Sequence, residues 1–130
     1  MAQTVFITGG SRGIGAACVR AFAAAGWQVA FTYRVSREVA GALAEQTGAL
    51  ALCADLHDDK AVSRAFGEVR GHFGAPDAVV CNAGIAEQKL FQDITDEDWQ
   101  RMLDVNLLGA VRTIRAALPN LLHRKHGSIV

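Results

Sequence analysis

Glycines cluster near the start of the chain, in the segment Thr8-Gly9-Gly10-Ser11-Arg12-Gly13-Ile14-Gly15. The segment follows a short apolar run and opens an alanine-rich helical pattern. Glycines at such a turn let the chain reverse sharply, approach a pyrophosphate closely and pack the new helix on the strand. The free N–H groups at the helix start then attract phosphate. The spacing G-x-x-x-G-x-G, with no lysine after the last glycine, predicts a dinucleotide site rather than an NTPase phosphate loop. The alternative is a strand-to-helix turn that binds nothing.

Small and polar residues follow two later apolar runs. Asp55 and Leu56 come just after the third run, and Asn82-Ala83-Gly84 comes just after the fourth. The carboxyl ends of parallel strands meet at one edge of a sheet, where ligands of such folds bind. There a carboxylate can accept from an adenine amino group, and small residues can let a ribose pass.

Asn106 lies inside a helical pattern, between Val105 and Leu107. Asparagine is a poor interior helix residue because its amide competes with the backbone for hydrogen bonds. We therefore consider it a candidate functional residue. The alternative is an amide that is satisfied locally by a side chain or by water.

The elements that would position these residues alternate between strand and helix. Strands are expected at residues 5–8, 29–33, 49–54 and 78–81, with a fifth starting at 128–130. Helices are expected at 14–25, 37–47, 59–73 and 96–125, and residues 82–94 form a loop. Short apolar strands separated by helices of this length predict an α/β Rossmann-type fold, a doubly wound parallel sheet that stops within its fifth strand.

Several helix ends and faces have their own signals. Ser36 and Asp58 are expected to cap the second and third helices, and Thr95 with Asp98 forms a capping-box pattern. Val39 and Leu43 are expected to face the core from the second helix. Proline inside a helix removes a hydrogen bond, so Pro119 is expected to bend or break the long fourth helix.

Composition limits the class of protein. The 130 residues are 51% hydrophobic and 20% charged with zero formal net charge, which is typical of one soluble globular domain. Balanced charge predicts neither a nucleic-acid partner nor a membrane partner. The N-terminus lacks the basic segment of a signal peptide, and Cys18, Cys53 and Cys81 are expected to be buried free thiols in a reducing cytoplasm. No histidine or cysteine spacing predicts a metal site.

Taken together, these motifs resemble the short-chain dehydrogenase/reductase family over all 130 residues. The matching positions are the T-G-x-x-x-G-x-G loop from Thr8 to Gly15, then Asp55, Asn82-Ala83-Gly84 and Asn106. Cys81 departs from the family's N-N-A-G motif, where an asparagine is usual. The resemblance implies a seven-stranded sheet and a homo-dimer or homo-tetramer built partly on the fourth helix. It also implies a catalytic Asn106, which would hold a proton-relay water at a distorted point of that helix.

The charge pattern indicates NADP(H) as the cofactor. Family members that bind NAD need an acid at the end of strand two, where this chain has Tyr33 followed by Arg34. Arg12 and Arg37 add positive charge, and arginine can hold a 2′-phosphate with two hydrogen bonds. The alternative is that these arginines are merely solvated. The expected cofactor-binding residues are Gly9, Ser11, Arg12, Gly13, Ile14, Gly15, Tyr33, Arg34, Asp55, Leu56, Asn82, Ala83 and Gly84.

The family's remaining catalytic residues are a serine after strand five and a Tyr-x-x-x-Lys motif on the next helix. Tyr33 is the only tyrosine here, and Ser128 comes too early in strand five. We therefore expect residues 1–130 to be the NADP(H)-binding N-terminal part of one domain, inactive alone. The alternative is a short nucleotide-binding or assembly module without enzyme activity.

The substrate is expected to be a small-molecule or carrier-bound carbonyl compound. Residues 91–99 are most similar to 3-oxoacyl-carrier-protein reductases. The same stretch also resembles reductases that act on an aminopentanone modification of elongation factor P. A sugar or steroid alcohol is a third possibility, and resemblance of fold does not separate the three.

Overall fold

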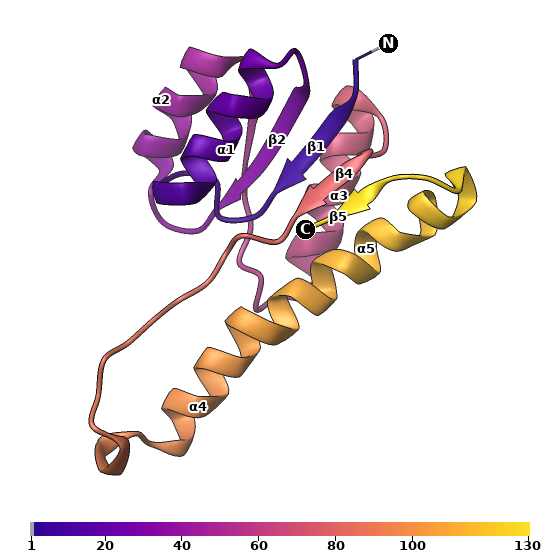
Figure 1. Ribbon diagram of the computed structural model, residues 1–130. Helices are drawn as coiled ribbons and strands as arrows, with labels where there is room; N and C mark the ends of the chain where they lie inside the picture. The colour runs from indigo at the N-terminus through magenta and orange to yellow at the C-terminus, as the bar shows by residue number, and fades with distance from the viewer. Residues whose placement is uncertain (1) are drawn as a thin grey trace.

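A computed structural model describes residues 2–130 and contains one five-stranded parallel sheet (Figure 1). The strands lie in the order β3-β2-β1-β4-β5. They are β1 (Thr4–Ile7), β2 (Gln28–Tyr33), β3 (Leu50–Cys53), β4 (Ala78–Val80) and β5 (Ser128–Ile129). The order reverses between β1 and β4, and such a reversal point is where open α/β sheets bind ligands. The predicted doubly wound parallel sheet is confirmed.

Helices cover both faces of the sheet (Figure 1). They are α1 (Gly13–Ala24), α2 (Arg37–Thr47), α3 (Asp59–Phe73), α4 (Asp96–Leu103) and α5 (Gly109–Arg124). Side chains alternate along β1, so Val5 and Ile7 pack with α1 and α2 while Phe6 packs with α3 and α5. Phe6 stacks on Phe66 of α3 with ring centroids 4.2 Å apart. Two apolar layers therefore hold the sheet edge that carries the predicted site.

The ends of the helices follow the sequence signals except at α2. The Asp58 carboxylate accepts from the Lys60 amide, and Thr95 forms the capping box with Asp98. Ser36, in contrast, makes no capping bond, because its hydroxyl accepts from the Arg12 guanidinium instead. The prediction that Val39 faces the core was also wrong. Val39 is exposed, and α2 presents Ala40 with Leu43 to the sheet.

The long fourth helix is interrupted, but not at Pro119. Helix α5 continues through Pro119 to Arg124, so the predicted break is wrong. Both Pro119 and Arg115, whose carbonyl loses its partner, lie on the exposed side of α5, where water can replace the missing donor. The interruption is instead the π-helix η2 (Asp104–Leu108), which contains Asn106.

The cysteines are all free, but they are less buried than expected. Cys53 is exposed because it ends β3, a strand at the edge of the sheet. Cys18 and Cys81 are half-buried, and burial raises the pKa of the Cys81 thiol. Within residues 2–130, no helix is both long enough and apolar enough to cross a membrane.

The predicted loop after β4 lies along α4 and contains one short turn of helix, η1 (Phe91–Asp93) (Figure 1). Ion pairs hold it there. Lys89 Nζ lies 2.8 Å from Asp98 Oδ2, and Arg101 contacts both Glu87 and Asp98. The Thr95 amide donates to the same Asp98 carboxylate at 3.0 Å. Asp98 therefore joins the loop to the first turn of α4.

We expect the stabilisation that Asp98 provides to weaken in acid. The hydrogen bond from Lys89, followed by that from Thr95, holds the pKa of Asp98 well below its usual range. A lowered folded-state pKa stabilises the protein fully above the unfolded-state pKa of about 3.9. This contribution shrinks below that pH and is lost completely only when the pH falls through the folded-state pKa. Asp98→Asn should therefore lower the melting temperature most at pH 6, and by a smaller but still clear amount at pH 3, where folded Asp98 stays ionised. Thermal melts from pH 3 to pH 6 would measure this, with the exposed Glu45→Gln on α2 as the control. An Asp98→Asn effect that is equal at both pH values would contradict it.

Candidate functional site

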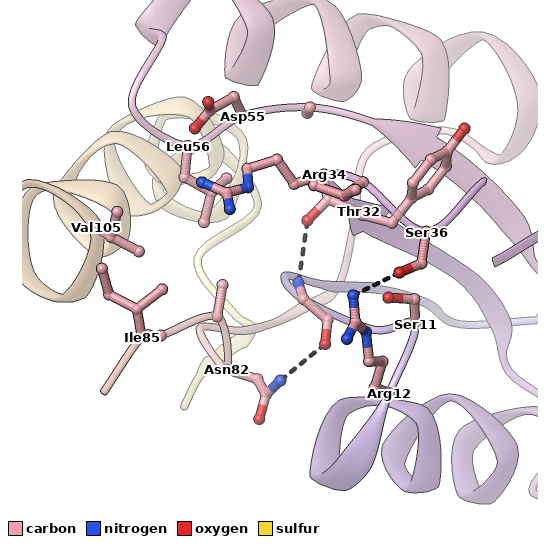
Figure 2. Close-up of a pocket in the computed structure, with 16 residues that line it drawn as sticks. Ser11, Arg12, Thr32, Arg34, Ser36, Asp55, Leu56, Asn82, Ile85 and Val105 are labelled. Carbon is pink, nitrogen blue, oxygen red and sulfur yellow. Dashed lines mark hydrogen bonds between the residues drawn. The ribbon is translucent and has the colours of Figure 1, made fainter. Parts of the chain in front are cut away.

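A cavity of about 450 Å³ opens where the carboxyl ends of four strands meet (Figure 2). Most of the residues predicted to bind a cofactor line it. These are Gly9, Ser11, Arg12, Tyr33, Arg34, Asp55, Leu56, Asn82, Ala83 and Gly84. Segments that are far apart in the sequence thus come together at the reversal point of the sheet, as the strand pattern predicted.

Four predicted residues lie outside the cavity lining: Gly13, Ile14, Gly15 and Asn106. Gly13 begins α1 with a left-handed φ of 55°, and Ile14 is exposed on the first turn of that helix. Gly15 lies behind the loop, where an added Cβ would come within 2.1 Å of the Gly9 carbonyl oxygen. Gly13 and Gly15 therefore shape the glycine loop rather than form the cavity wall.

The lining also includes residues that the sequence prediction missed: Thr32, Val35, Ser36, Ala54, Ile85 and Val105. The first five are next to predicted residues or flank the same strand ends, so position alone could have indicated them. Val105 comes from η2, and its neighbour Asn106 was the available signal.

Thr8 joins the glycine loop to the end of β4. Its buried hydroxyl accepts from the amides of Asn82 and Ala83, both at 3.1 Å. In return, Asn82 Nδ2 donates to the carbonyl oxygens of Thr8 at 3.2 Å and Gly9 at 3.1 Å. These bonds fix the spacing between the two sides of the cavity.

Replacing Thr8 with valine should destabilise the protein, because valine keeps the shape but removes the acceptor for two amides. The expected loss is about 1–3 kcal/mol in the free energy of unfolding. Urea denaturation would measure it. Thr113→Val is a matched control, because the buried Thr113 hydroxyl only donates within α5, to Gly109 at 2.8 Å. Equal losses in the two variants would show that Thr8 has no special role.

The glycine loop can lie against the sheet because it lacks side chains. Gly9 has a φ of 66°, and an added Cβ there would lie 2.9 Å from the Ala83 Cα. An added Cβ on Gly10 would lie 2.5 Å from the Phe31 Cβ. The loop leads into α1, whose N-cap residue, Arg12, makes no side-chain capping bond. The N–H groups of the first turn are thus available to an anionic ligand such as a pyrophosphate.

Two positively charged side chains line the cavity. Arg34, directly after β2, extends across the cavity toward Leu56, and Arg12 lies beside Ser11 and Ser36 (Figure 2). The Arg12 guanidinium donates to the Ser36 hydroxyl at 2.5 Å. The only acidic side chain in the lining is Asp55, which accepts from the His57 amide at 3.0 Å. Two arginines in one cavity suit a dianionic group such as a phosphate.

Asn106 supports the opposite wall. Its Oδ1 accepts from the Ile85 amide at 2.8 Å, and its Nδ2 donates to the Ile85 carbonyl at 2.9 Å. An added Cβ on Gly84 would lie 3.1 Å from Asn106 Oδ1, so the small residue lets the two segments approach. The resemblance placed Asn106 at a distorted point of its helix, and the π-helix η2 is found there. The amide itself is satisfied locally by the backbone of Ile85.

Comparison with known proteins gives one family. The short chain dehydrogenase family matches residues 3–130. The chain is 33% identical over its full length to a 3-oxoacyl-[acyl-carrier-protein] reductase of Staphylococcus aureus, covering 55% of that protein. It is 34% identical over its full length to an acetoacetyl-CoA reductase of Paracoccus denitrificans, covering 54% of it. The chain therefore spans about half the length of the curated relatives it matches.

A solved structure shows the same likeness. A blue fluorescent protein from a metagenomic library, solved in complex with NADPH, superposes with a TM-score of 0.86 at 37% identity. The superposition covers 90% of this chain and 50% of that protein.

Proposed function

The chain belongs to the short chain dehydrogenase family of oxidoreductases, and from that premise we propose that residues 1–130 are the NADP(H)-binding part of a carbonyl reductase. The observation that carries this proposal is the pair of arginines, Arg12 and Arg34, in the lining of the cavity. Tyr33 stands where NAD-binding members need an acid, so nothing at the end of β2 would repel a 2′-phosphate. The NADPH complex of a structural relative supports the same cofactor.

The chain's residues fit each part of such a cofactor. The first turn of α1 would hold the pyrophosphate, and Arg12 with Arg34 would hold the 2′-phosphate. Asp55 would accept from the adenine amino group, and Ala83 with Gly84 would let a ribose pass. The nicotinamide ring supplies the hydride chemistry when bound. Asn106 would hold the Ile85 wall beside the ring, in addition to any water it positions.

We propose that the substrate is a 3-oxoacyl thioester, since two curated relatives are named for such reductions. An aminopentanone-modified elongation factor P and a sugar or steroid alcohol remain the alternative substrates. We also assign the protein to the cytoplasm, where three free cysteines would stay reduced.

Binding and turnover together test this function. The 130-residue chain should bind NADPH, detected by nicotinamide fluorescence, but should not oxidise it with acetoacetyl-CoA, because its single tyrosine is Tyr33. Fusing the chain to the C-terminal half of the Staphylococcus aureus relative should restore turnover. A folded fusion that binds NADPH without turnover would instead favour the non-enzymatic nucleotide-binding module.

We further propose that the protein forms a homo-dimer or homo-tetramer through the α4–α5 face. Trp99, Leu103, Leu107 and Val111 recur there at four-residue intervals and are exposed. Leu107→Glu would place a charge in the middle of this face, so it should shift the protein toward monomer in sedimentation experiments. Glu45→Gln on α2 is the control. If the unchanged protein is already a monomer at high concentration, this proposal is wrong.

A further inference from the structure

A polar cluster outside the cavity connects its two walls. We propose that Arg112 and Asp104 are positioning residues that hold the loop after β3 against the π-helix η2 and so keep the cofactor cavity formed. We call Arg112, Asp104 and loop residues 55–57 the Arg112 latch. The expected effect on NADPH binding rests on the proposed function, whereas the contacts among Arg112, Asp104 and the loop do not depend on it.

Arg112 of α5 spans the gap between the loop and η2. Its Nη1 donates to the Leu56 carbonyl oxygen at 2.9 Å, and its Nη2 donates to Asp104 Oδ1 at 2.8 Å. The other oxygen of the Asp104 carboxylate contacts His57 Nδ1 of the same loop. The loop is therefore tied to η2 by two connections, one through Arg112 and one through His57.

The ion pair between Arg112 and Asp104 is largely shielded from water, whereas His57 is exposed. The side chains of Arg112 and Asp104 are only 17% and 15% exposed. Removing one partner would leave the other as a poorly solvated, unpaired charge. The planar guanidinium can reach the carbonyl and the carboxylate at once, whereas a lysine ammonium on a flexible stem lacks that fork.

Close packing at Gly109 also holds the loop after β3 against the helix. Gly109 begins α5, and its amide donates to the Asp104 carbonyl oxygen, which is the five-residue bond of the π-helix. A Cβ added there would lie 3.2 Å from the Leu56 Cβ. The loop thus rests on the helix at the point where η2 becomes α5.

The latch reaches both walls of the cavity. On one side, Asp55 and Leu56 line the cavity directly. On the other, Val105 follows Asp104 and lines the cavity, and Asn106 holds Ile85. Arg112 itself lies outside the lining, so it acts through these residues and is not itself expected to touch a ligand.

Two measurements test the latch: amide hydrogen exchange and titration with NADPH. Each is made on the unmodified chain, on Arg112→Met and on Arg112→Lys. The amides to follow are Asp58, which donates to the Asp55 carbonyl, and Ile85, which donates to Asn106. Arg115→Met is the matched control, because Arg115 lies one turn along α5, is 68% exposed and meets only Asp59 at 3.9 Å among its charged neighbours in the described chain. Protection of amides in β1 and β4 shows that each variant is folded.

Both Arg112 variants should exchange faster at Asp58 and Ile85, and Arg115→Met should not. If the cavity is then formed about one-tenth of the time, the Kd for NADPH rises about tenfold. Wild-type exchange rates at both amides in Arg112→Met would overturn the latch, whatever the affinity. So would faster exchange with an unchanged Kd, because the latch would then not serve the cavity. If the unmodified chain fails to bind NADPH, the proposed function has failed, and the exchange rates still decide whether the latch exists.

Discussion

Gly15→Ala is expected to lower the free energy of unfolding by about 3 kcal/mol or more and to abolish NADPH binding. The added Cβ would lie 2.1 Å from the Gly9 carbonyl oxygen and 2.6 Å from Asn82 Nδ2. Both neighbours are fixed, because the Gly9 carbonyl accepts from Asn82 and Asn82 is held by Thr8. The glycine loop would therefore have to move away from β4, which removes the place for the pyrophosphate.

A second glycine gives the matched control for this prediction. Gly67 lies on the exposed side of α3, and an added Cβ there would meet nothing within 4 Å. Because alanine favours helix, Gly67→Ala should stabilise the protein by about 0.5–1 kcal/mol. Chemical denaturation of both variants would measure the contrast. A Gly15→Ala variant as stable as Gly67→Ala would mean that the glycine loop does not pack as described.

Arg12→Met with Arg34→Met is expected to weaken NADPH binding about a hundredfold while changing NADH binding little. Each guanidinium can make a charge-assisted contact with the 2′-phosphate, and about 1.5 kcal/mol for each is the low end of the usual range. We take the low end because both side chains are exposed and solvent screens their charge. NADH has no 2′-phosphate, so its affinity should be spared.

The exposed Arg20→Met on α1 serves as the charge control, because it removes an arginine that does not line the cavity. Titrations of NADPH and NADH into the unmodified chain, the double variant and Arg20→Met at one ionic strength would give the six affinities needed. If the double variant weakens both nucleotides equally, the arginines support the fold or the pyrophosphate rather than select for the 2′-phosphate.

The sheet and much of the site could be predicted from local signals. The first four strands are short apolar runs, and each is followed by residues that line the cavity, as with Asp55 and Asn82. Local patterns in the sequence were less informative about which face of a helix is buried and where a helix is interrupted. Val39 and Ala40 are adjacent apolar residues, and only the packing of α2 on the sheet decides that Ala40 turns inward. Pro119 continues its helix because it lies on the exposed side, which its sequence neighbourhood did not reveal.

Contacts between distant segments could not be predicted. Asn106 was identified as unusual, but its two hydrogen bonds to Ile85 depend on how the loop after β4 returns to η2. Arg112 had no local signal at all, because arginine is ordinary in a helix and its partner Leu56 is 56 residues away. Its contribution depends on a backbone carbonyl, and a carbonyl gives no pattern in the sequence.

The most direct test of the account is the affinity of this chain for NADPH and for NADH, measured by isothermal titration calorimetry in the same buffer. The account predicts that NADPH binds at least about tenfold more tightly, since one or two contacts of about 1.5 kcal/mol or more distinguish the nucleotides. Comparable dissociation constants for the two nucleotides would contradict it.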